Sequence, residues 1–391
     1  MTSGFDEAKL TANLDALLGG WVSTGALPCV QAVVHRHGTT AYSRSFGVAD
    51  LDTAEPLADD AIFRIFSMTK VFTSVSALML LEEGRYKMHD PLSAYFPEFA
   101  HMQVAETGPS GEVRLVPARR EIIVRDLFTM ATGWTYPGES CPTERALTAA
   151  LYDNPEAPMG PAEFLTALAG VPLAFHPGEH WRYGFSIDVL GCLVAHLSGQ
   201  TLGEFMYQRI FEPLGLVDTG FYLPVDKVKR LVTMYDVDDA GAFTPATFGA
   251  PYTAPPALEG GGGGLVSTVA DVTRFARMLL GEGELDGVRL LSRKSVELMR
   301  TNHLTPQQLA DYTWDTQRGY GYGLGVRVMM HPEIAGYGTV GEFAWDGLAG
   351  TWFAIDPTED LVAVLMVQTN PGRHYRFIPL YAGTVYGAIA D

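Results

Sequence analysis

The segment Asp60–Lys70 reads DAIFRIFSMTK and leads into an apolar stretch, Val71–Leu81. Ser67 and Lys70 stand three residues apart, so a helix through them places both side chains on one face. A serine hydroxyl is a weak nucleophile until a neighbouring base takes its proton. A lysine amine serves as that base when burial or nearby positive charge lowers its pKa. The spacing therefore predicts a serine nucleophile with a lysine activator.

The surroundings of this pair strengthen the prediction. Ser-x-x-Lys arises often by chance, but Lys70 is the only one of the six lysines with a serine three residues before it. Phe63, Ile65 and Phe66 supply apolar cover. If Ser67 lies in the first turn of its helix, free backbone N–H groups and the helix dipole stabilise an oxyanion there.

The composition indicates an acidic globular enzyme. Of the 391 residues, 47% are hydrophobic and 18% charged, which excludes intrinsic disorder. The net charge of −18 argues against nucleic acid or an anionic membrane as a partner. We expect no disulfide framework and, because the N-terminus lacks the pattern of a signal peptide, a cytoplasmic location. The three cysteines are far apart: Cys29, Cys141 and Cys192.

Hydrophobic patterning predicts strand-rich ends around a helix-rich middle. Helices are expected at both ends, over Leu10–Trp21 and Phe377–Ala390. Two strand pairs are expected, over Cys29–Arg36, Thr40–Val48, Thr351–Asp356 and Leu361–Gln368. Helices of the middle are expected over Ile123–Met130, Pro161–Leu168, Ile187–Leu197 and Leu202–Ile210. We therefore predict an α/β domain formed by residues 1–75 and 255–391, with an inserted helical domain over residues 76–254.

Two further patterns look functional but lack the context that their chemistry needs. His176–His180 reads HPGEH, yet a Pro-Gly step opposes the single helix on which two zinc-binding histidines would share a face. The glycine run Gly260–Gly264 is not followed by the Gly-Lys-Ser/Thr of a phosphate loop. The nucleophile-elbow pattern Gly-x-Ser-x-Gly does not occur. We expect neither a metal ion nor a cofactor.

Further segments follow Ser-x-x-Lys in a recognisable order. They are IVRDLFTMATG at 123–133, PGEHWRY at 177–183, GGGLVST at 262–268, YGYGLG at 320–325, and WDG at 345–347 with Asp356-Pro357 after it. The set resembles serine β-lactamases and penicillin-binding proteins, and is most similar to family VIII carboxylesterases. This resemblance, over roughly residues 20–390, implies a β-lactamase/transpeptidase-like fold, whose mainly antiparallel sheet comes from both chain ends and is flanked by helices.

The resemblance also implies roles for individual residues. Ser67 matches the nucleophile, Lys70 its activator, and Tyr183 the tyrosine that relays protons among nucleophile, leaving group and water. The backbone N–H groups of Ser67 and Leu348 match the oxyanion hole, the second of them at a strand edge. The residues expected to line the substrate site are Phe185, Trp345, Asp346 and Gly347.

This sequence departs from the β-lactamase motifs at three of these positions. Phe185 replaces the second-motif asparagine, and Ser186 beside it is expected to substitute in part. Trp345 replaces the third-motif lysine that would meet a β-lactam carboxylate. Asp346 replaces a glycine usual in family VIII, and the sequence does not explain it. Aromatic walls favour apolar or aromatic substrates. Trp134, Tyr136 and Trp352 are further candidates for the wall, but scattered aromatic residues are more often part of the core, so we assign only Phe185 and Trp345 to it.

The sequence therefore predicts a serine carboxylesterase that hydrolyses short-chain or aromatic esters through an acyl-enzyme on Ser67, with a small-molecule ester as its only predicted partner. Several alternatives stay open on the same machinery: a β-lactamase or D-Ala-D-Ala peptidase, an acyltransferase, and an amidase. A catalytically silent ligand-binding scaffold is the alternative outside enzymes. The sequence predicts no oligomeric state.

Overall fold

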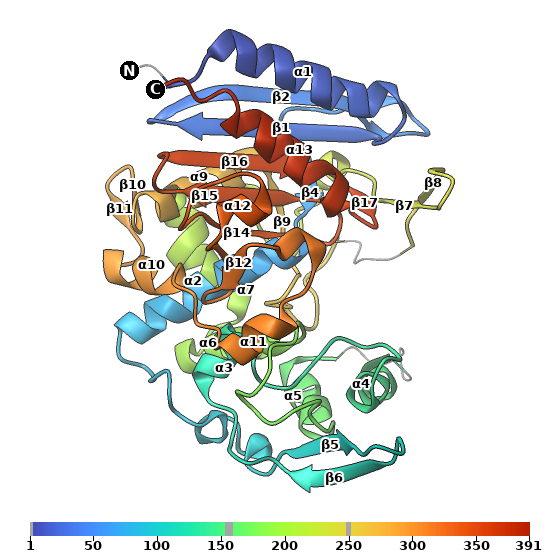
Figure 1. Ribbon diagram of the computed structural model, residues 1–391, viewed down its shortest axis with the longest axis vertical. Coiled ribbons are helices and arrows are strands. Elements are labelled where there is room, and N and C mark those ends of the chain that lie inside the picture. Colours follow the sequence, from blue (N-terminus) through green and yellow to red (C-terminus); the bar gives the residue numbers. More distant parts are fainter. Residues whose placement is uncertain (1–2, 153–158, 248–251) are drawn as a thin grey trace.

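An eight-stranded sheet lies at the centre of the computed structural model, which describes residues 3–152, 159–247 and 252–391 (Figure 1). Every neighbouring pair in this sheet is antiparallel. In spatial order its strands are β12 (Tyr320–Tyr322), β13 (Arg327–Met329), β14 (Phe343–Asp346), β15 (Trp352–Asp356), β16 (Leu361–Met366), β1 (Cys29–Arg36), β2 (Thr39–Asp50) and β3 (Glu55–Pro56). Both ends of the chain build this one sheet, which confirms the predicted fold class.

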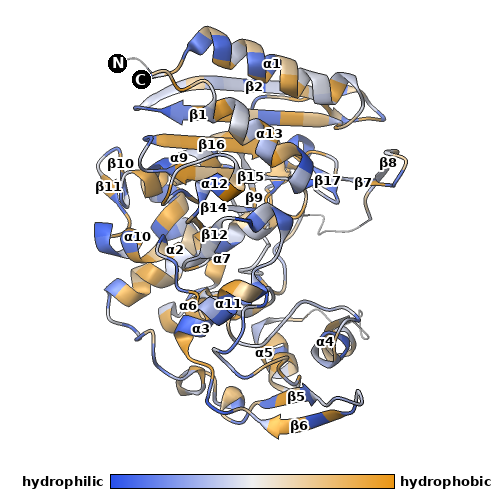
Figure 2. Cartoon of the chain, viewed as in Figure 1, coloured by the Kyte–Doolittle hydropathy of each residue, from blue (hydrophilic) through white to orange (hydrophobic). Residues whose placement is uncertain are grey.

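The middle of the sheet forms because its strands are apolar on both faces. β16 reads LVAVLM, and all of its residues are buried (Figure 2). It pairs with β1 on one side and β15 on the other, with Val364 opposite both Val33 and Phe353. Near-continuous apolar runs of this kind are typical of strands that are covered on both faces.

Helices cover both faces of the sheet. α1 (Glu7–Ser23) and α13 (His374–Tyr386) lie together on one face. The hydroxyl of Tyr381 in α13 donates to the carbonyls of Val33 and Val364, which fastens this helix to the two central strands. α9 (Val269–Leu280) packs on the strands from the other face.

α2 (Thr69–Glu82) runs through the larger hydrophobic core behind α9. All its residues from Thr69 to Leu80 are buried, so its polar side chains need internal partners. Thr73 and Ser76 donate to the carbonyls four residues earlier, of Thr69 and Phe72. The ring of Phe72 stacks on Phe275 of α9, with centroids 3.7 Å apart. The start of α2 is therefore held firmly in the interior.

The middle of the chain is mainly helical, as predicted, but it also contains a hairpin that the patterning missed. Its helices are α3 (Val124–Phe128), α4 (Pro142–Tyr152), α5 (Pro161–Ala169), α6 (Ser186–Ser198), α7 (Leu202–Met206), a π-helical turn (Tyr207–Phe211) and α8 (Glu212–Leu214). The hairpin consists of β5 (Gln103–Thr107) and β6 (Val113–Pro117). Val113 and Leu115 of β6 are exposed, so no clear alternation of buried and exposed residues marked this strand.

Short elements complete the fold. The strands are β4 (Ile62–Arg64) with β9 (Val266–Thr268), β7 (Tyr235–Val237) with β8 (Phe243–Pro245) and β17 (Thr369–Asn370), and β10 (Glu284–Leu285) with β11 (Val288–Arg289). The helices are α10 (Arg293–Met299), α11 (Pro306–Asp311) and α12 (Pro332–Ala335), and 3₁₀ turns lie at Phe66–Met68, Leu92–Ala94, Pro97–Phe99, Val228–Arg230 and Asp315–Gln317. Within the described ranges, no helix combines the length and apolar character needed to cross a bilayer. We propose the domain limits given above, because the central sheet draws its strands from both chain ends.

Candidate active site

Ser67 lies where a strained turn meets the central helix. It occupies the middle of the 3₁₀ turn Phe66–Met68, which continues directly into α2, so the serine precedes the α-helix instead of belonging to its first turn. Phe66 has a φ of 42°, which is rare for a bulky side chain. Such strain gathers at functional sites where the surrounding structure holds it. The turn leaves Ser67 partly exposed while its neighbours are buried.

The amine of Lys70 has three oxygen partners. Its Nζ lies 3.0 Å from Ser67 Oγ, 3.0 Å from the hydroxyl of Tyr136 and 2.5 Å from the carbonyl oxygen of Gly262. A neutral amine offers two N–H donors and one lone pair. The carbonyl accepts one N–H, a tyrosine hydroxyl can accept the other, and the lone pair is then available to the Ser67 hydroxyl. The arrangement therefore suits a neutral lysine that accepts the serine proton.

The environment of Lys70 increases the fraction of that neutral form. The side chain has no exposed surface, and this burial lowers the pKa of Lys70 from 10.5 to about 8. The negative charges of Asp188 and Asp346 act in the opposite direction and raise this pKa. A buried lysine whose pKa is near 8 can act as a general base close to neutral pH. The predicted pairing of Ser67 with Lys70 thus appears in the structure as a contact with suitable electrostatics.

Tyr183 lies over the same amine and is held by Trp345. Lys70 Nζ is 4.6 Å from the centroid of the Tyr183 ring, and the indole N–H of Trp345 donates to the Tyr183 hydroxyl over 3.0 Å. Burial raises the pKa of Tyr183, while hydrogen bonds with Ser67 and Trp345 lower it; the net change is upward from 10. The phenol is therefore protonated at neutral pH, so it can donate a proton to a departing group.

Two backbone N–H groups are available as oxyanion donors. Neither Ser67 nor Leu348 donates its N–H to any acceptor among the described residues. Leu348 lies in the turn between β14 and β15, and β14 is an inner strand whose last two residues run past the end of β13. The side chain of Leu348 is exposed. Both donors therefore remain free to bind an oxygen atom.

Gly347 allows these two turns to approach each other. A Cβ on Gly347 would lie 2.3 Å from the carbonyl oxygen of Ile65, two residues before the nucleophile. Any larger residue would therefore push the Leu348 turn away from the serine. The imidazole Nε2 of His374 lies 2.8 Å from the carbonyl oxygen of Gly347 and donates to it from the start of α13. The turn is thus fixed from both sides.

The other residues predicted for the substrate site take unexpected partners. Trp345 has no exposed surface, and its one polar atom is bonded to Tyr183. Asp346 forms an ion pair with the buried Arg327 of β13, with 3.0 Å between Oδ2 and Nη1, which gives this departure from the family motif a structural role. Phe185 is half-buried and stands edge-on to the Tyr136 ring. Direct substrate contacts of these residues stay predictions.

Tyr136 makes a contact with the catalytic lysine that the sequence did not predict. From the sequence we considered it as a wall of the pocket and then set it aside, but its hydroxyl contacts Lys70. The hydroxyl of Ser186, which we expected to substitute in part for the second-motif asparagine, is instead buried against that of Thr132 at 2.8 Å. The only sequence signal for a role in the site is that Tyr136 lies three residues after the end of the family segment 123–133.

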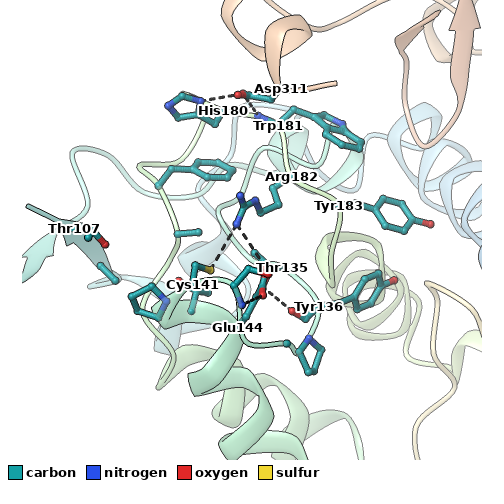
Figure 3. Close-up of a pocket in the computed structure, with 18 of the residues that line it drawn as sticks. Thr107, Thr135, Tyr136, Cys141, Glu144, His180, Trp181, Arg182, Tyr183 and Asp311 are labelled. Atoms are coloured by element: carbon teal, nitrogen blue, oxygen red, sulfur yellow. Dashed lines mark hydrogen bonds and ion pairs between the residues drawn. The ribbon is translucent and has the colours of Figure 1, made fainter. Parts of the chain in front are cut away.

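A cavity of about 960 Å³ adjoins the two tyrosines (Figure 3). The rings of Tyr136 and Tyr183 form part of its wall, and their hydroxyls point away from its centre. Ser67 and Lys70 are not among the residues that line it. The side chain of Arg182 projects into the cavity (Figure 3). Its Nη1 lies 3.8 Å from Oε1 of Glu144 in α4, so the two side chains form an ion pair. The cavity therefore lies beside the reacting atoms, behind the tyrosines.

Comparison with known proteins agrees with this geometry. Residues 10–383 match the family model described as Beta-lactamase. Protein Rv1367c of Mycobacterium tuberculosis is 38% identical over 335 residues, which cover 83% of this chain and 82% of that protein. Lovastatin esterase of Penicillium rubens is 30% identical over 379 residues, or 91% of this chain and 92% of the esterase. The solved structure of EstCE1, titled a hydrolase with promiscuous acyltransferase activity, has a TM-score of 0.82 at 24% identity and covers 97% of this chain and 99% of its own. These matches confirm the predicted fold and the resemblance to β-lactamase-like esterases.

Proposed function

Because the chain belongs to the β-lactamase family, we propose that it is a serine carboxylesterase that forms an acyl-enzyme on Ser67. The observation that carries the proposal is the 3.0 Å contact between Ser67 Oγ and the fully buried amine of Lys70. Lovastatin esterase, a relative that carries an esterase name, supports ester substrates over β-lactams. The replacement of the third-motif lysine by Trp345 supports the same choice, because it leaves no cation at that position to meet a β-lactam carboxylate.

In the acylation step, Ser67 Oγ attacks the carbonyl carbon of the ester while neutral Lys70 takes its proton. The carbonyl oxygen becomes an oxyanion that the N–H groups of Ser67 and Leu348 stabilise. The bond from carbon to the alcohol oxygen then breaks, and the Tyr183 hydroxyl gives its proton to that oxygen. The ammonium of Lys70 returns a proton to the Tyr183 phenolate. The alcohol has then left, and the acyl group is bonded to Ser67.

Deacylation follows the reverse proton path. A water molecule attacks the acyl carbon and passes a proton to the Lys70–Tyr183 pair, and the ester bond to Ser67 Oγ breaks as that oxygen regains a proton. The products are the carboxylic acid and the free enzyme. The half-buried rings of Phe185 and Tyr136, together with the adjoining cavity, support esters with short-chain or aromatic groups as substrates.

Acyl transfer is the second candidate function. EstCE1, which shares the fold, is titled a hydrolase with promiscuous acyltransferase activity. In this reaction an alcohol takes the place of water in the second step, and the Lys70–Tyr183 pair accepts its proton in the same way. Product analysis of an ester incubated with an added alcohol separates the two functions, because transfer gives a new ester and hydrolysis gives only the acid.

The test of the proposed function combines active-site labelling with one matched pair of variants. Intact-mass spectrometry after incubation with a p-nitrophenyl phosphonate, followed by peptide mapping, is expected to find one adduct on Ser67. Ser67→Ala should lower the hydrolysis of p-nitrophenyl butyrate by roughly a thousandfold or more. Ser74→Ala is the control, because Ser74 lies in α2, the helix that follows the turn of Ser67, and its buried hydroxyl has no hydrogen-bond partner within the described chain. An unlabelled Ser67, or a Ser67→Ala variant that keeps activity within a few fold, would contradict the proposal.

A further inference from the structure

A buried carboxylate lies behind the catalytic lysine and is connected to it through one backbone unit. Asp188, in the first turn of α6, is 9% exposed. Its Oδ1 accepts the N–H of Gly262 at 2.9 Å, and the carbonyl of the same glycine accepts Lys70 Nζ. The second carboxylate oxygen, Oδ2, is buried and has no hydrogen-bond partner in the parts of the chain that the structure describes. Asp188 and Lys70 therefore bind the N–H and the carbonyl of the same residue, Gly262.

The packing of the glycine run shows how tightly this connection is built. A Cβ on Gly262 would lie 2.2 Å from Asp188 Oδ2, and a Cβ on Gly261 would lie 2.8 Å from the carbonyl oxygen of Ile187. From the other side, the Thr73 hydroxyl of α2 donates to the carbonyl of Gly261 at 2.8 Å. The run that superficially resembled a phosphate loop is thus held between α2 and α6, and close approach requires glycine at positions 261 and 262.

We propose that Asp188 is the positioning residue of Lys70. Its hydrogen bond to the Gly262 N–H orients the carbonyl of that glycine toward the amine, and its ionised form places a negative charge behind the amine. The inference rests on the proposed function, since it concerns the base of that reaction. An acceptor that points at one N–H of the amine leaves the lone pair directed at Ser67 Oγ. Asp188 does not touch the reacting atoms, so it acts only through Gly262 and through its field.

The carboxyl group of Asp188 is one of several polar groups that face Lys70. The others are Asp346 at the end of β14, the hydroxyls of Tyr136 and Tyr183, and Ser67 itself. Burial and, after it, the charge of Asp188 raise the pKa of the Cys192 thiol, one turn further along α6. Burial also raises the pKa of Asp188 itself, while the charge of Lys70 lowers it. A negative charge near an ammonium stabilises the protonated form. Removal of the charge of Asp188 should therefore lower the pKa of Lys70.

Two substitutions separate the geometry from the charge. Asp188→Asn keeps an oxygen that can accept the Gly262 N–H, so we expect kcat near that of wild type and an acid limb of kcat/KM moved to lower pH by about half a unit or more. Asp188→Ala removes both, so kcat should fall by about ten- to a hundredfold because the amine loses its orientation. Asp271→Asn is the control, since Asp271 of α9 is also a buried aspartate. Its Oδ2 accepts the N–H of Asp218 and the hydroxyl of Thr219, and it is not among the charges that act on Lys70. This control should leave the pH profile unchanged.

A neighbouring pair of glycines tests the same contact without any change of charge. Gly262→Ala forces the new methyl group against Asp188 and should lower kcat as Asp188→Ala does. Gly263→Ala adds a methyl group whose nearest atom is 3.7 Å away, an ordinary contact, and should behave as wild type. Circular dichroism and thermal unfolding establish that each variant is folded.

Phosphonate labelling of Ser67 in the wild-type protein tests the esterase function separately from the positioning role of Asp188. If the wild type gives no adduct, the proposed function fails. If the wild type is labelled and both Asp188 variants keep the kcat and the acid limb of the wild type, the positioning role of Asp188 is refuted and the esterase stands. A shift of the profile in Asp271→Asn equal to that in Asp188→Asn also refutes it.

Discussion

The hydrogen bond from Trp345 to Tyr183 leads to a prediction that separates two roles of the tryptophan. Trp345→Phe keeps an aromatic ring in the same buried place but removes the indole N–H that donates over 3.0 Å to the Tyr183 hydroxyl. When Tyr183 gives its proton to the leaving alcohol, its oxygen gains negative charge and this bond strengthens. Hydrogen bonds to charged groups contribute about 1.5–3 kcal/mol. We therefore expect kcat to fall by about ten- to a hundredfold.

The change in KM distinguishes this role from that of a pocket wall. Because Trp345 has no exposed surface, its truncation should leave KM for p-nitrophenyl acetate nearly unchanged. If the tryptophan instead forms a wall that holds the substrate, KM rises and kcat changes little. Loss of the bond also raises the pKa of Tyr183 further, so the loss of activity should persist across the pH range in which the phenol stays protonated.

A second tryptophan provides the matched control. Trp352 lies in the neighbouring strand β15, is equally buried, and its indole N–H has no hydrogen-bond partner among the described residues. Trp352→Phe makes the same change of ring size in the buried sheet without breaking a hydrogen bond, so it should keep the kcat of wild type, with thermal unfolding to establish that both variants are folded. A Trp345→Phe variant with kcat within twofold of wild type, or equal losses of kcat in both variants, would refute the reasoning.

Two further predictions follow from buried charges. The folded pKa of Lys70, about 8, lies below the usual 10.5, so the folded state binds fewer protons than the unfolded state between these values and wild-type stability rises with pH across that range. Lys70→Met should abolish activity, raise the melting temperature at pH 7, and remove the increase of stability with pH that wild type shows between about 8 and 10.5. A Lys70→Met variant that melts below wild type at pH 7 would contradict this prediction. Burial raises the pKa of Glu342 to about 7, so its contribution to stability is complete below pH 4.5 and is lost as the pH rises through 7. Glu342→Gln should therefore melt above wild type at pH 8 and below it at pH 4, which paired melting curves test directly.

The sequence predicted the elements whose patterns are local. β16 is a continuous apolar run and β1 is mainly apolar, because both strands are buried along their whole length. α1 shows buried residues at helical spacing: Leu10, Leu14, Leu18 and Trp21. Ser67 and Lys70 were found for the same reason, since a spacing of three residues on a helical turn fixes their contact. Such signals need no knowledge of how distant parts of the chain meet.

The residues that escaped prediction depend on tertiary packing. Tyr136 reaches Lys70 across 66 positions of sequence, and Asp188 reaches Gly262 across 74. Arg327 meets Asp346 only because β13 and β14 are neighbours in the sheet. No spacing rule links these positions, so an aspartate in a helix and a tyrosine in a loop looked like ordinary residues. The hairpin β5–β6 was missed for another reason, because its exposed apolar residues blur the period of the strand.

The aromatic replacements in this site preserve hydrogen bonding while they change the charge. The hydroxyl of Tyr136 contacts Lys70, and the indole N–H of Trp345, which stands at the third-motif lysine in the sequence, donates to the hydroxyl of Tyr183. Tyrosine and tryptophan combine a large apolar body with one polar atom, so they can fill a wall and still join a proton network. Without a cation at position 345, Tyr183 keeps its proton, and its raised pKa suits it to protonate a strongly basic alkoxide. The same exchange that removes a partner for the carboxylate of a β-lactam therefore leaves the chemistry of ester cleavage intact.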